Sequence, residues 1–312
     1  MSAWLEAHRL ANLAAAQTHG DLNVDPAHFP VDVFGAIGEA DVMLIWRSLP
    51  RLFGAYLDEP DSRPGIILNN GLSHAAQRQT AAHELGHHVL GHGTRTDLDL
   101  DPFTERHTNW SDVEKAAEAF ASWFLMPRRA MAAAMARLGL ERLTQPAEVY
   151  RLSLLLGTPY RSTLRHLPNV RLASQTLTRS WMSVPPGQIK AGLDPAPVPT
   201  SREPDVWVVG PALTGLTLSV RPRDRLIIEL ADSADRVEAG PGVVELATRT
   251  AAAPGMRGAP SEAVRRVPFE VGATPGPAEH TITVRSSTRS DSWAVQLKVE
   301  GHRSGIARRW VT

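Results

Sequence analysis

The amino-acid sequence predicts an α+β domain at the N-terminus, a small helical module in the middle and an antiparallel β-sandwich at the C-terminus. In the first 139 residues, short β-rich runs occur together with longer segments of helical periodicity. After Asp205, short runs of alternating apolar and polar residues follow one another between turns. A chain of 312 residues is also long for a single hydrophobic core, which favours several domains.

The N-terminal domain, residues 1–139, begins with an amphipathic helix over residues 3–18, which Gly20 can end. Three β-rich runs, separated by turns rich in Pro and Asp, then cover residues 42–47, 52–57 and 65–70. A helix is expected from about Ser73 to Leu90. After a long polar loop, two more helices are expected over residues 111–126 and 127–138.

The rest of the chain divides into three parts. Residues 140–185 form a helical module, in which two short helices around Gly157 have the spacing of a helix-turn-helix. Dense Pro and Gly mark residues 186–204 as a linker. Residues 205–312 carry eight β runs, from "DVWVVG" to "IARRWVT", at the short spacing that is typical of a sandwich or barrel.

Charge and cysteine content restrict the classes of function. Lys+Arg and Asp+Glu number 33 each, so no overall field attracts the chain to nucleic acid or to an anionic membrane. Cysteine is absent, which excludes disulfides, thiolate metal ligands and cysteine nucleophiles. The first residues lack the pattern of a signal peptide, and no stretch approaches the ~18 apolar residues of a membrane span. We therefore expect a cytoplasmic protein without a membrane partner.

Histidines and a glutamate are concentrated in "TAAHELGHHVLGH", residues 80–92. Residues four apart share one face of an α-helix, so His83 and His87 can hold one metal ion. Glu84 is rotated by roughly 100° from His83, which places it beside the ion as a general base for a metal-bound water. The alternative is a solvated, histidine-rich helix, and the apolar stripe on the same helix disfavours it. His88 and His92 lie off this face and are interpreted as surface or supporting residues.

A catalytic zinc site uses three protein ligands and keeps one position open for water. Glu114 and Glu118 are one turn apart in the following predicted helix, so both can face the same point. Glu114 also has a structural alternative, because Ser111-x-x-Glu114 is a capping box in which the carboxylate binds backbone amides. The spacing therefore leaves the role of each carboxylate open.

These two helices resemble those of the ImmA/IrrE-type metallopeptidases, bacterial zinc endopeptidases that cleave repressor proteins. The family shows H-E-x-x-H and then E-x-x-A-N-x-F-A followed by L-M-P, where this chain reads "EKAAEAFASWFLMP". The resemblance covers about residues 1–170 and implies a zincin-like, gluzincin-type metallopeptidase domain followed by a helix-turn-helix module. It makes Glu114 the third ligand. Glu118 occupies the family's Asn position and is an alternative ligand or a second carboxylate close to the metal.

The resemblance also implies a function, that of a zinc-dependent endopeptidase. Its protein substrate would be a DNA-binding helix-turn-helix repressor, whose cleavage relieves repression under stress or during mobile-element induction. The three ligands would hold one Zn²⁺, although histidine and carboxylate also accept Mn²⁺ or Fe²⁺. Glu84 would act as the catalytic base, and His107 or Tyr150 would donate a proton to the oxyanion. We expect the substrate to lie along an edge strand, "GIILNN" (65–70).

A second hypothesis makes the chain a DNA-binding transcription regulator whose metal site is structural or inactive. Its support is a group of basic residues around the second short helix: Arg151, Arg161, Arg165, His166 and Arg171. The balanced overall charge favours the alternative that these helices are a packing module. For the C-terminal region, "RDRLIIELADSAD" and "SWAVQLKVEGHRSGIARRWV" resemble chagasin-like inhibitor sandwiches, which implies a fold class and no activity.

Overall fold

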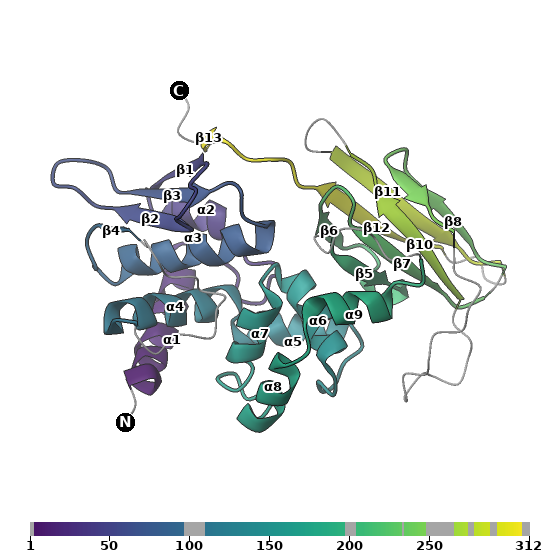
Figure 1. Ribbon diagram of the computed structural model, residues 1–312, viewed down its shortest axis with the longest axis horizontal. Coiled ribbons are helices and arrows are strands. Elements are labelled where there is room, and N and C mark those ends of the chain that lie inside the picture. The colour runs from purple at the N-terminus through teal and green to yellow at the C-terminus, as the bar shows by residue number, and fades with distance from the viewer. Residues whose placement is uncertain are drawn as a thin grey trace.

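A computed structural model describes residues 3–96, 110–196, 204–232, 234–247, 265–273, 278–287 and 292–307. The described residues form a mixed α/β structure with three small sheets, and helices lie between the first sheet and the other two (Figure 1). Among these residues, no helix combines the length and the apolar character needed to cross a membrane.

The first sheet has the strand order β13-β1-β3-β2-β4. Its strands are β1 (Met43–Arg47), β2 (Gly54–Leu57), β3 (Gly65–Asn69), β4 (Arg95–Thr96) and β13 (Gly305–Ile306). β1 and β3 run parallel, whereas β2 runs antiparallel to β3. Alternate residues are buried on the face toward the helices, among them Leu44, Ile66 and Leu68. This period of two is why the β-rich runs form half-buried strands.

Two features of this sheet differ from the expectation. β3 is hydrogen-bonded to β1 on one side and to β2 on the other, so "GIILNN" is an interior strand and has no free edge for a substrate. The strand β13 comes from the region predicted to be part of the sandwich, yet it pairs with β1, with Ile45 opposite Ile306. The chain thus returns to its first sheet after the C-terminal β region (Figure 1).

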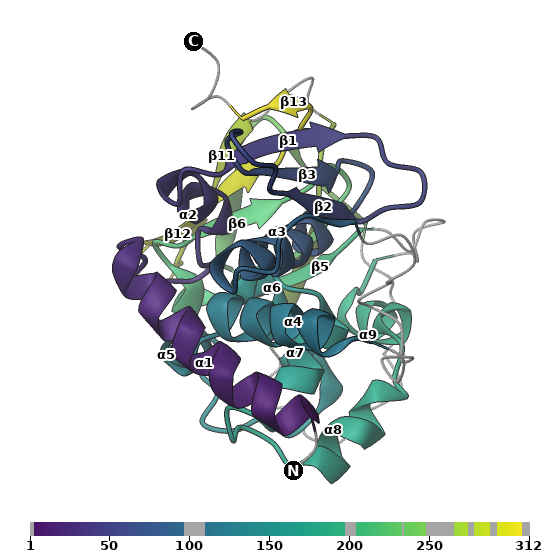
Figure 2. The same ribbon diagram turned by 90° about the vertical axis from the view of Figure 1, so that its left-hand side faces the viewer.

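Helices stack below the sheet in layers (Figure 2). α3 (His74–Val89) lies against the strands, α4 (Asp112–Leu125) packs on α3, and α1 (Ala3–Asp21) crosses α4. The short α2 (Val33–Glu39) contacts both β1 and α3. A Cβ atom at Gly86 would lie 3.1 Å from Phe120 and 3.2 Å from the Ala117 backbone. The absence of a side chain at Gly86 therefore permits the close contact between α3 and α4.

Five shorter helices follow: α5 (Arg128–Arg137), α6 (Pro146–Leu156), α7 (Tyr160–His166), α8 (Gln175–Met182) and α9 (Pro186–Leu193). α6 ends at Gly157, whose φ of 63° is left-handed, and α7 begins three residues later. Most of α7 is buried, so the second helix of this pair packs inward. Part of the predicted linker is helical, since α9 lies within it. Pro186 is compatible with this helix because it occupies the first turn, where its missing N–H is tolerated.

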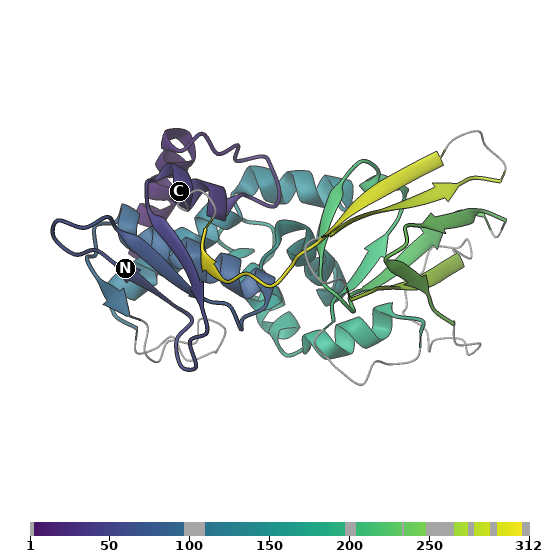
Figure 3. The same ribbon diagram turned by 90° about the horizontal axis from the view of Figure 1, so that it is seen from above.

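The C-terminal β region contains two four-stranded sheets that share one buried core (Figure 3). The first has the order β5 (Val206–Val209), β7 (Arg225–Leu230), β10 (Arg265–Val271), β9 (Val243–Glu245). The second has the order β6 (Thr217–Val220), β12 (Ser292–Val299), β11 (Ala278–Arg285), β8 (Arg236–Ala239). The short 3₁₀ helix η2 (Pro211–Leu213) precedes β6. The predicted antiparallel arrangement is wrong in two places, since β5–β7 and β6–β12 are parallel pairs.

Candidate metal centre

Helix α3 presents His83 and His87 one turn apart in the interior of the N-terminal domain. Ser73 caps the helix, because its hydroxyl accepts a hydrogen bond from the Ala76 N–H at 3.3 Å. The two histidines are 4% and 0% exposed. A solvated histidine-rich helix is therefore wrong for this segment, as the imidazoles point into the packed layer between α3 and α4.

Three ligand atoms from two helices converge beside these histidines. The His83 Nε2 atom lies 3.1 Å from His87 Nε2 and 3.1 Å from Glu114 Oε2. The distance between His87 Nε2 and Glu114 Oε2 is 3.3 Å. Among the described residues, these three form a group able to hold a metal ion.

This spacing fits a tetrahedral metal site. Nitrogen and oxygen atoms bound at about 2.1 Å to a tetrahedral ion lie about 3.4 Å from one another. The three measured distances are close to this value. Two imidazole nitrogens and a carboxylate oxygen facing one point are also donor types that a divalent cation binds. The residues present therefore fit the metal that the motif predicts.

Helix α4 provides the third atom of this candidate ligand group, and the carboxylate of Glu114 does not cap the helix. Ser111 caps α4 by accepting a hydrogen bond from the Glu114 N–H at 3.3 Å, while the Glu114 carboxylate points to the histidines. Burial opposes ionisation of Glu114. The hydrogen bonds and charges of His83 and His87 outweigh it and hold the pKa of Glu114 well below its usual value. Glu114 is thus suited to remain a carboxylate at this buried position.

Glu118 lies behind His83, on the side away from the three ligand atoms. Its Oε2 atom is 3.5 Å from His83 Nδ1, and the Gln79 side-chain amide donates a hydrogen bond to its Oε1 at 3.2 Å. A carboxylate in this position orients the imidazole and favours the tautomer whose Nε2 lone pair faces the ligand group. The structure therefore gives Glu114 and Glu118 different positions.

Glu84 is fully buried and lies against strand β2. A Cβ atom built on Gly54 would be 2.8 Å from Glu84 Oε1 and 2.6 Å from Thr80 Cγ2. Gly54 therefore leaves the space that the Glu84 carboxylate occupies, and sequence reasoning missed it. The signal available was a glycine inside a β-rich run, which often marks a close approach of another group.

Further histidines and an aromatic ring surround the ligands. The Nδ1 atoms of His87 and His92 are 3.0 Å apart, and the Tyr56 hydroxyl is 2.8 Å from His88 Nδ1. The Trp110 ring is 6.3 Å from the His83 ring, in an edge-on arrangement. Sequence reasoning missed Trp110, which is buried beside the ligand group.

Of the two proposed oxyanion donors, the structure describes Tyr150. His107 lies outside the described residues. The Tyr150 hydroxyl donates to Asp205 at 3.1 Å and accepts from the Val206 N–H at 2.9 Å, so it joins α6 to the start of β5. Burial first, and then the charge of Asp205, raises the pKa of Tyr150 well above its usual value. These contacts give Tyr150 a structural position at the junction with the C-terminal β region.

Comparison with known proteins identifies the N-terminal part. Residues 39–155 match the family model of peptidase family M78, the IrrE N-terminal-like domain, which confirms the family that the two helical motifs indicate. A search of curated proteins finds no significant match. Among solved structures, the cysteine protease inhibitor EhICP2 from Entamoeba histolytica is similar at 13% identity with a TM-score of 0.23. That similarity covers 31% of this chain and 98% of the inhibitor.

Proposed function

We propose that the protein is a zinc-dependent endopeptidase of the gluzincin type. The reason is that residues 39–155 match the model of the IrrE N-terminal-like family of peptidases. The observation that carries this proposal is the convergence of His83, His87 and Glu114 at 3.1–3.3 Å beside the buried Glu84. A single Zn²⁺ is the ion that this ligand set and spacing favour, and Mn²⁺ or Fe²⁺ are alternatives with the same donor types. A zincin-like arrangement of strands and helices in the first domain is part of the same proposal.

Each residue has a defined part in the proposed reaction. Bound zinc would supply Lewis acidity and lower the pKa of an attacking water to about 7. Glu84 accepts the proton of that water as it attacks the scissile carbonyl, and later returns the proton to the leaving amide nitrogen. Glu118, at 3.5 Å from His83 Nδ1, holds His83 in its orientation.

We further propose that the substrate is a DNA-binding helix-turn-helix repressor, and that cleavage relieves repression under stress or during mobile-element induction. The support for this substrate is the resemblance to ImmA/IrrE-type peptidases. The alternative function, a DNA-binding regulator, requires a second helix that presents basic residues to DNA. The burial of the basic residues on α7 disfavours it, because His166 is buried and Arg161 and Arg165 are only partly exposed.

The test compares wild type with Glu84→Gln, which retains the size of the side chain and removes the base. Both proteins are loaded with zinc, their metal content is measured by mass spectrometry, and each is incubated with a panel of DNA-binding repressors. We expect equal metal content and a loss of cleavage of about 10²–10⁴-fold in the variant. Equal cleavage by both proteins would refute Glu84 as the base. A His83→Ala variant should lose the metal as well as the activity.

A further inference from the structure

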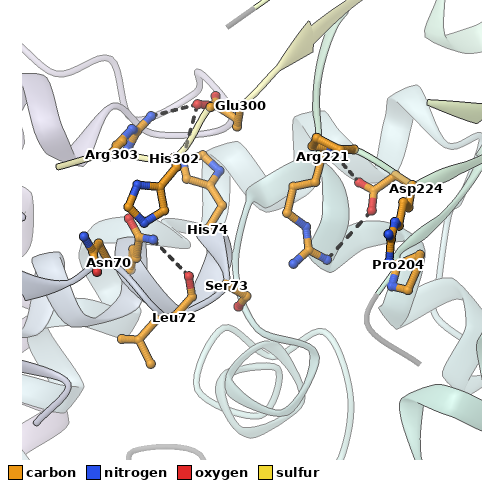
Figure 4. Close-up of a pocket in the computed structure, with 14 residues that line it drawn as sticks. Asn70, Leu72, Ser73, His74, Pro204, Arg221, Asp224, Glu300, His302 and Arg303 are labelled. Carbon is orange, nitrogen blue, oxygen red and sulfur yellow. Dashed lines mark hydrogen bonds and ion pairs between the residues drawn. The ribbon is translucent and has the colours of Figure 1, made fainter. Parts of the chain in front are cut away.

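A polar cavity lies at the end of helix α3 that is remote from the candidate metal ligands, where the first turn of α3 faces the C-terminal β region. Its volume is about 270 Å³, and Figure 4 shows His74 and Arg303 on one side and Arg221 and Asp224 on the other. Two further cavities share Ser73 and Arg221 with it. By the helical rise, His74 lies about 13 Å along α3 from His83, so this cavity is separate from the metal ligands.

Side chains in the wall of this cavity contain buried polar atoms that lack hydrogen-bond partners within the described part of the chain. Gln77 is 7% exposed; its amide nitrogen donates to the Leu72 carbonyl at 2.9 Å, but its Oε1 has no donor there. The same holds for His74 Nε2 and for Arg303 Nη1. The closest carboxylate to His74 Nε2 is that of Glu300, at 4.0 Å, beyond hydrogen-bond distance. Buried polar groups are rarely left unsatisfied, so these atoms point to a ligand.

Positive charge predominates around the cavity. Arg221, Arg223 and Arg303 line it, and the N-terminus of α3 adds its positive helix dipole. The two lining acids are engaged: Asp224 accepts the N–H groups of Asp205 and Arg221, and Glu300 pairs with Arg303 at 2.8 Å. Arg221 pairs with Asp205 at 2.7 Å, so Arg223 supplies the excess positive charge of the lining.

The pKa of His74 reflects the same excess of positive charge. Burial lowers the pKa of His74 well below its usual value, and four cations lower it further: Arg78, Arg303, Arg221 and Lys298. Glu300 is the acid closest to its ring. His74 is therefore a neutral ring in a positive environment, able to donate a hydrogen bond to an anion.

Arg223 is the cation at this cavity that is best placed for an incoming ligand. It is exposed in the turn between β6 and β7, and none of the ion pairs between described residues includes it. Its φ is 73°, a conformation that glycine adopts more readily than any other residue. A glycine at this position would thus satisfy the backbone but would lack the guanidinium.

We propose that this cavity binds a small phosphomonoester whose phosphate lies among Arg223, Arg303 and the first turn of α3. Guanidinium groups and helix N-termini are the donors that most often bind phosphate in proteins. The buried Gln77 Oε1 would accept a hydrogen bond from a hydroxyl or amino group on the rest of the ligand. Such a ligand bridges the helix that carries His83 and the C-terminal β region.

Isothermal titration calorimetry of the full chain, with and without zinc, tests this proposal. The probes are glycerol phosphate, adenosine 5′-monophosphate, inorganic phosphate and citrate. We expect at least one phosphomonoester to bind, and Arg223→Gly and Arg223→Glu to raise its Kd by about tenfold or more. Inorganic phosphate binding as tightly as the esters would identify free phosphate as the source of the bound group.

The control variant is Arg51→Gly, which removes an exposed arginine of the first domain and should leave the Kd unchanged. Circular dichroism and thermal unfolding would show that the Arg223 variants are folded. The proposal is overturned if no phosphate compound binds at about 10 mM, which corresponds to a negligible affinity. It is also overturned if citrate binds as tightly as the esters, or if Arg223→Gly has no effect. Because binding is measured without catalysis, failure here is distinguishable from failure of the proposed peptidase activity.

Discussion

Glu114 and Glu118 show how much the placement of a single side chain decides. The two residues are one helical turn apart and have the same chemistry, so spacing alone allows either of them to bind the metal. In the folded protein, Glu114 Oε2 meets both histidine Nε2 atoms, whereas Glu118 contacts the Nδ1 side of His83. Their different positions along α4 therefore make Glu114 a candidate metal ligand and Glu118 a residue that orients His83.

Replacement of Gly54 by alanine tests whether the space beside Glu84 is required. The new Cβ would lie 2.8 Å from Glu84 Oε1 and 3.1 Å from the Ile67 carbonyl, so the carboxylate must move. We expect Gly54→Ala to bind zinc as wild type does and to lose the proposed peptidase activity by about 10²-fold, since misplacement of a catalytic group by ~1 Å has an effect of this size.

The matched control for this prediction is Gly65→Ala in the neighbouring strand β3. Among the described residues, a Cβ atom there would have one neighbour within 4 Å, the Met43 carbonyl at 3.7 Å, which is an ordinary contact. Gly65→Ala should therefore retain both zinc and activity. Full activity in Gly54→Ala would show that the position of Glu84 tolerates the added methyl group.

His166 predicts a pH dependence of stability that is independent of the metal. Burial, and then the charge of His8, lowers the pKa of His166 to about 3, although its ring N–H donates to the Met126 carbonyl at 3.2 Å. An unfolded histidine titrates near 6.5, so between about pH 6.5 and 3 the unfolded state binds more protons than the folded state. Stability is then complete above pH 6.5 and decreases as the pH is lowered, by up to about 1.4 kcal/mol per pH unit.

Urea unfolding of the metal-free protein at pH 7 and pH 5 measures this effect. His166→Gln retains a donor for the Met126 carbonyl but cannot be protonated, so the loss of stability between the two pH values should be smaller than in wild type. His28→Gln removes an exposed histidine and should leave the difference unchanged. An identical pH dependence in wild type and His166→Gln would contradict the assignment.

At the scale of helices and strands, elements with strong local signals are those that the sequence predicts well. The run "TAAHELGHHVLGH" combines helical periodicity with the metal motif, and the structure has α3 over His74–Val89, within one residue of the expected bounds. Gly157 ends α6 as expected, because its left-handed φ is a local property of glycine.

The elements that sequence reasoning missed depend on distant partners. β13 has two residues and pairs with β1 across most of the chain, so no local pattern could reveal its partner. The alternation of apolar and polar residues is also the same in parallel and antiparallel strands, so it could not reveal that β5–β7 and β6–β12 are parallel. Glu84 was predicted from its motif, but the glycine that makes room for it comes from a strand far earlier in the chain.

A hydrogen bond to the turn at Gly157 connects helix α3 to the helical module. Arg78 of α3 is buried, and its Nε–H donates to the Gly157 carbonyl at 3.0 Å. A Cβ atom at Gly157 would lie 2.8 Å from that nitrogen. We expect Gly157→Ala to lower the free energy of unfolding by about 2–4 kcal/mol, from left-handed strain and from disruption of a buried hydrogen bond.

Gly139→Ala is the matched control for this variant. Gly139 also has a positive φ, of 68°, but no atom of the part of the chain that the structure describes lies within 4 Å of the position of its added Cβ. Only the backbone strain of about 1 kcal/mol applies there. Chemical denaturation of both variants would separate the effect of backbone strain from the effect of the contact with Arg78. Equal losses in the free energy of unfolding would mean that Arg78 adjusts to the added methyl group without a penalty.

At the scale of the whole molecule, several contacts join the C-terminal β region to the helices and to the first sheet. Tyr150 of α6 binds Asp205 and Val206 at the entry to this region. The side chain of Arg303 lies 4.4 Å from the Phe34 ring and 5.6 Å from the Trp46 ring, just before β13. β13 itself then pairs with β1. The proposed phosphate cavity lies between these connections, so its shape depends on all of them.

Disruption of β13 tests whether the C-terminal strand holds the two parts together. The Ala307 N–H donates to the Leu44 carbonyl at 2.9 Å, and Ala307→Pro removes this donor, whereas Ala307→Ser retains it. Unpaired edge amides exchange rapidly with solvent, so we expect hydrogen exchange in β1 to become about tenfold faster in the proline variant alone. Small-angle scattering should show a larger radius of gyration for the same variant, because the strand pairing that ties the end of the β region to the first sheet is lost. If exchange and scattering match those of Ala307→Ser, then β13 covers the edge of the sheet without holding the C-terminal region in place.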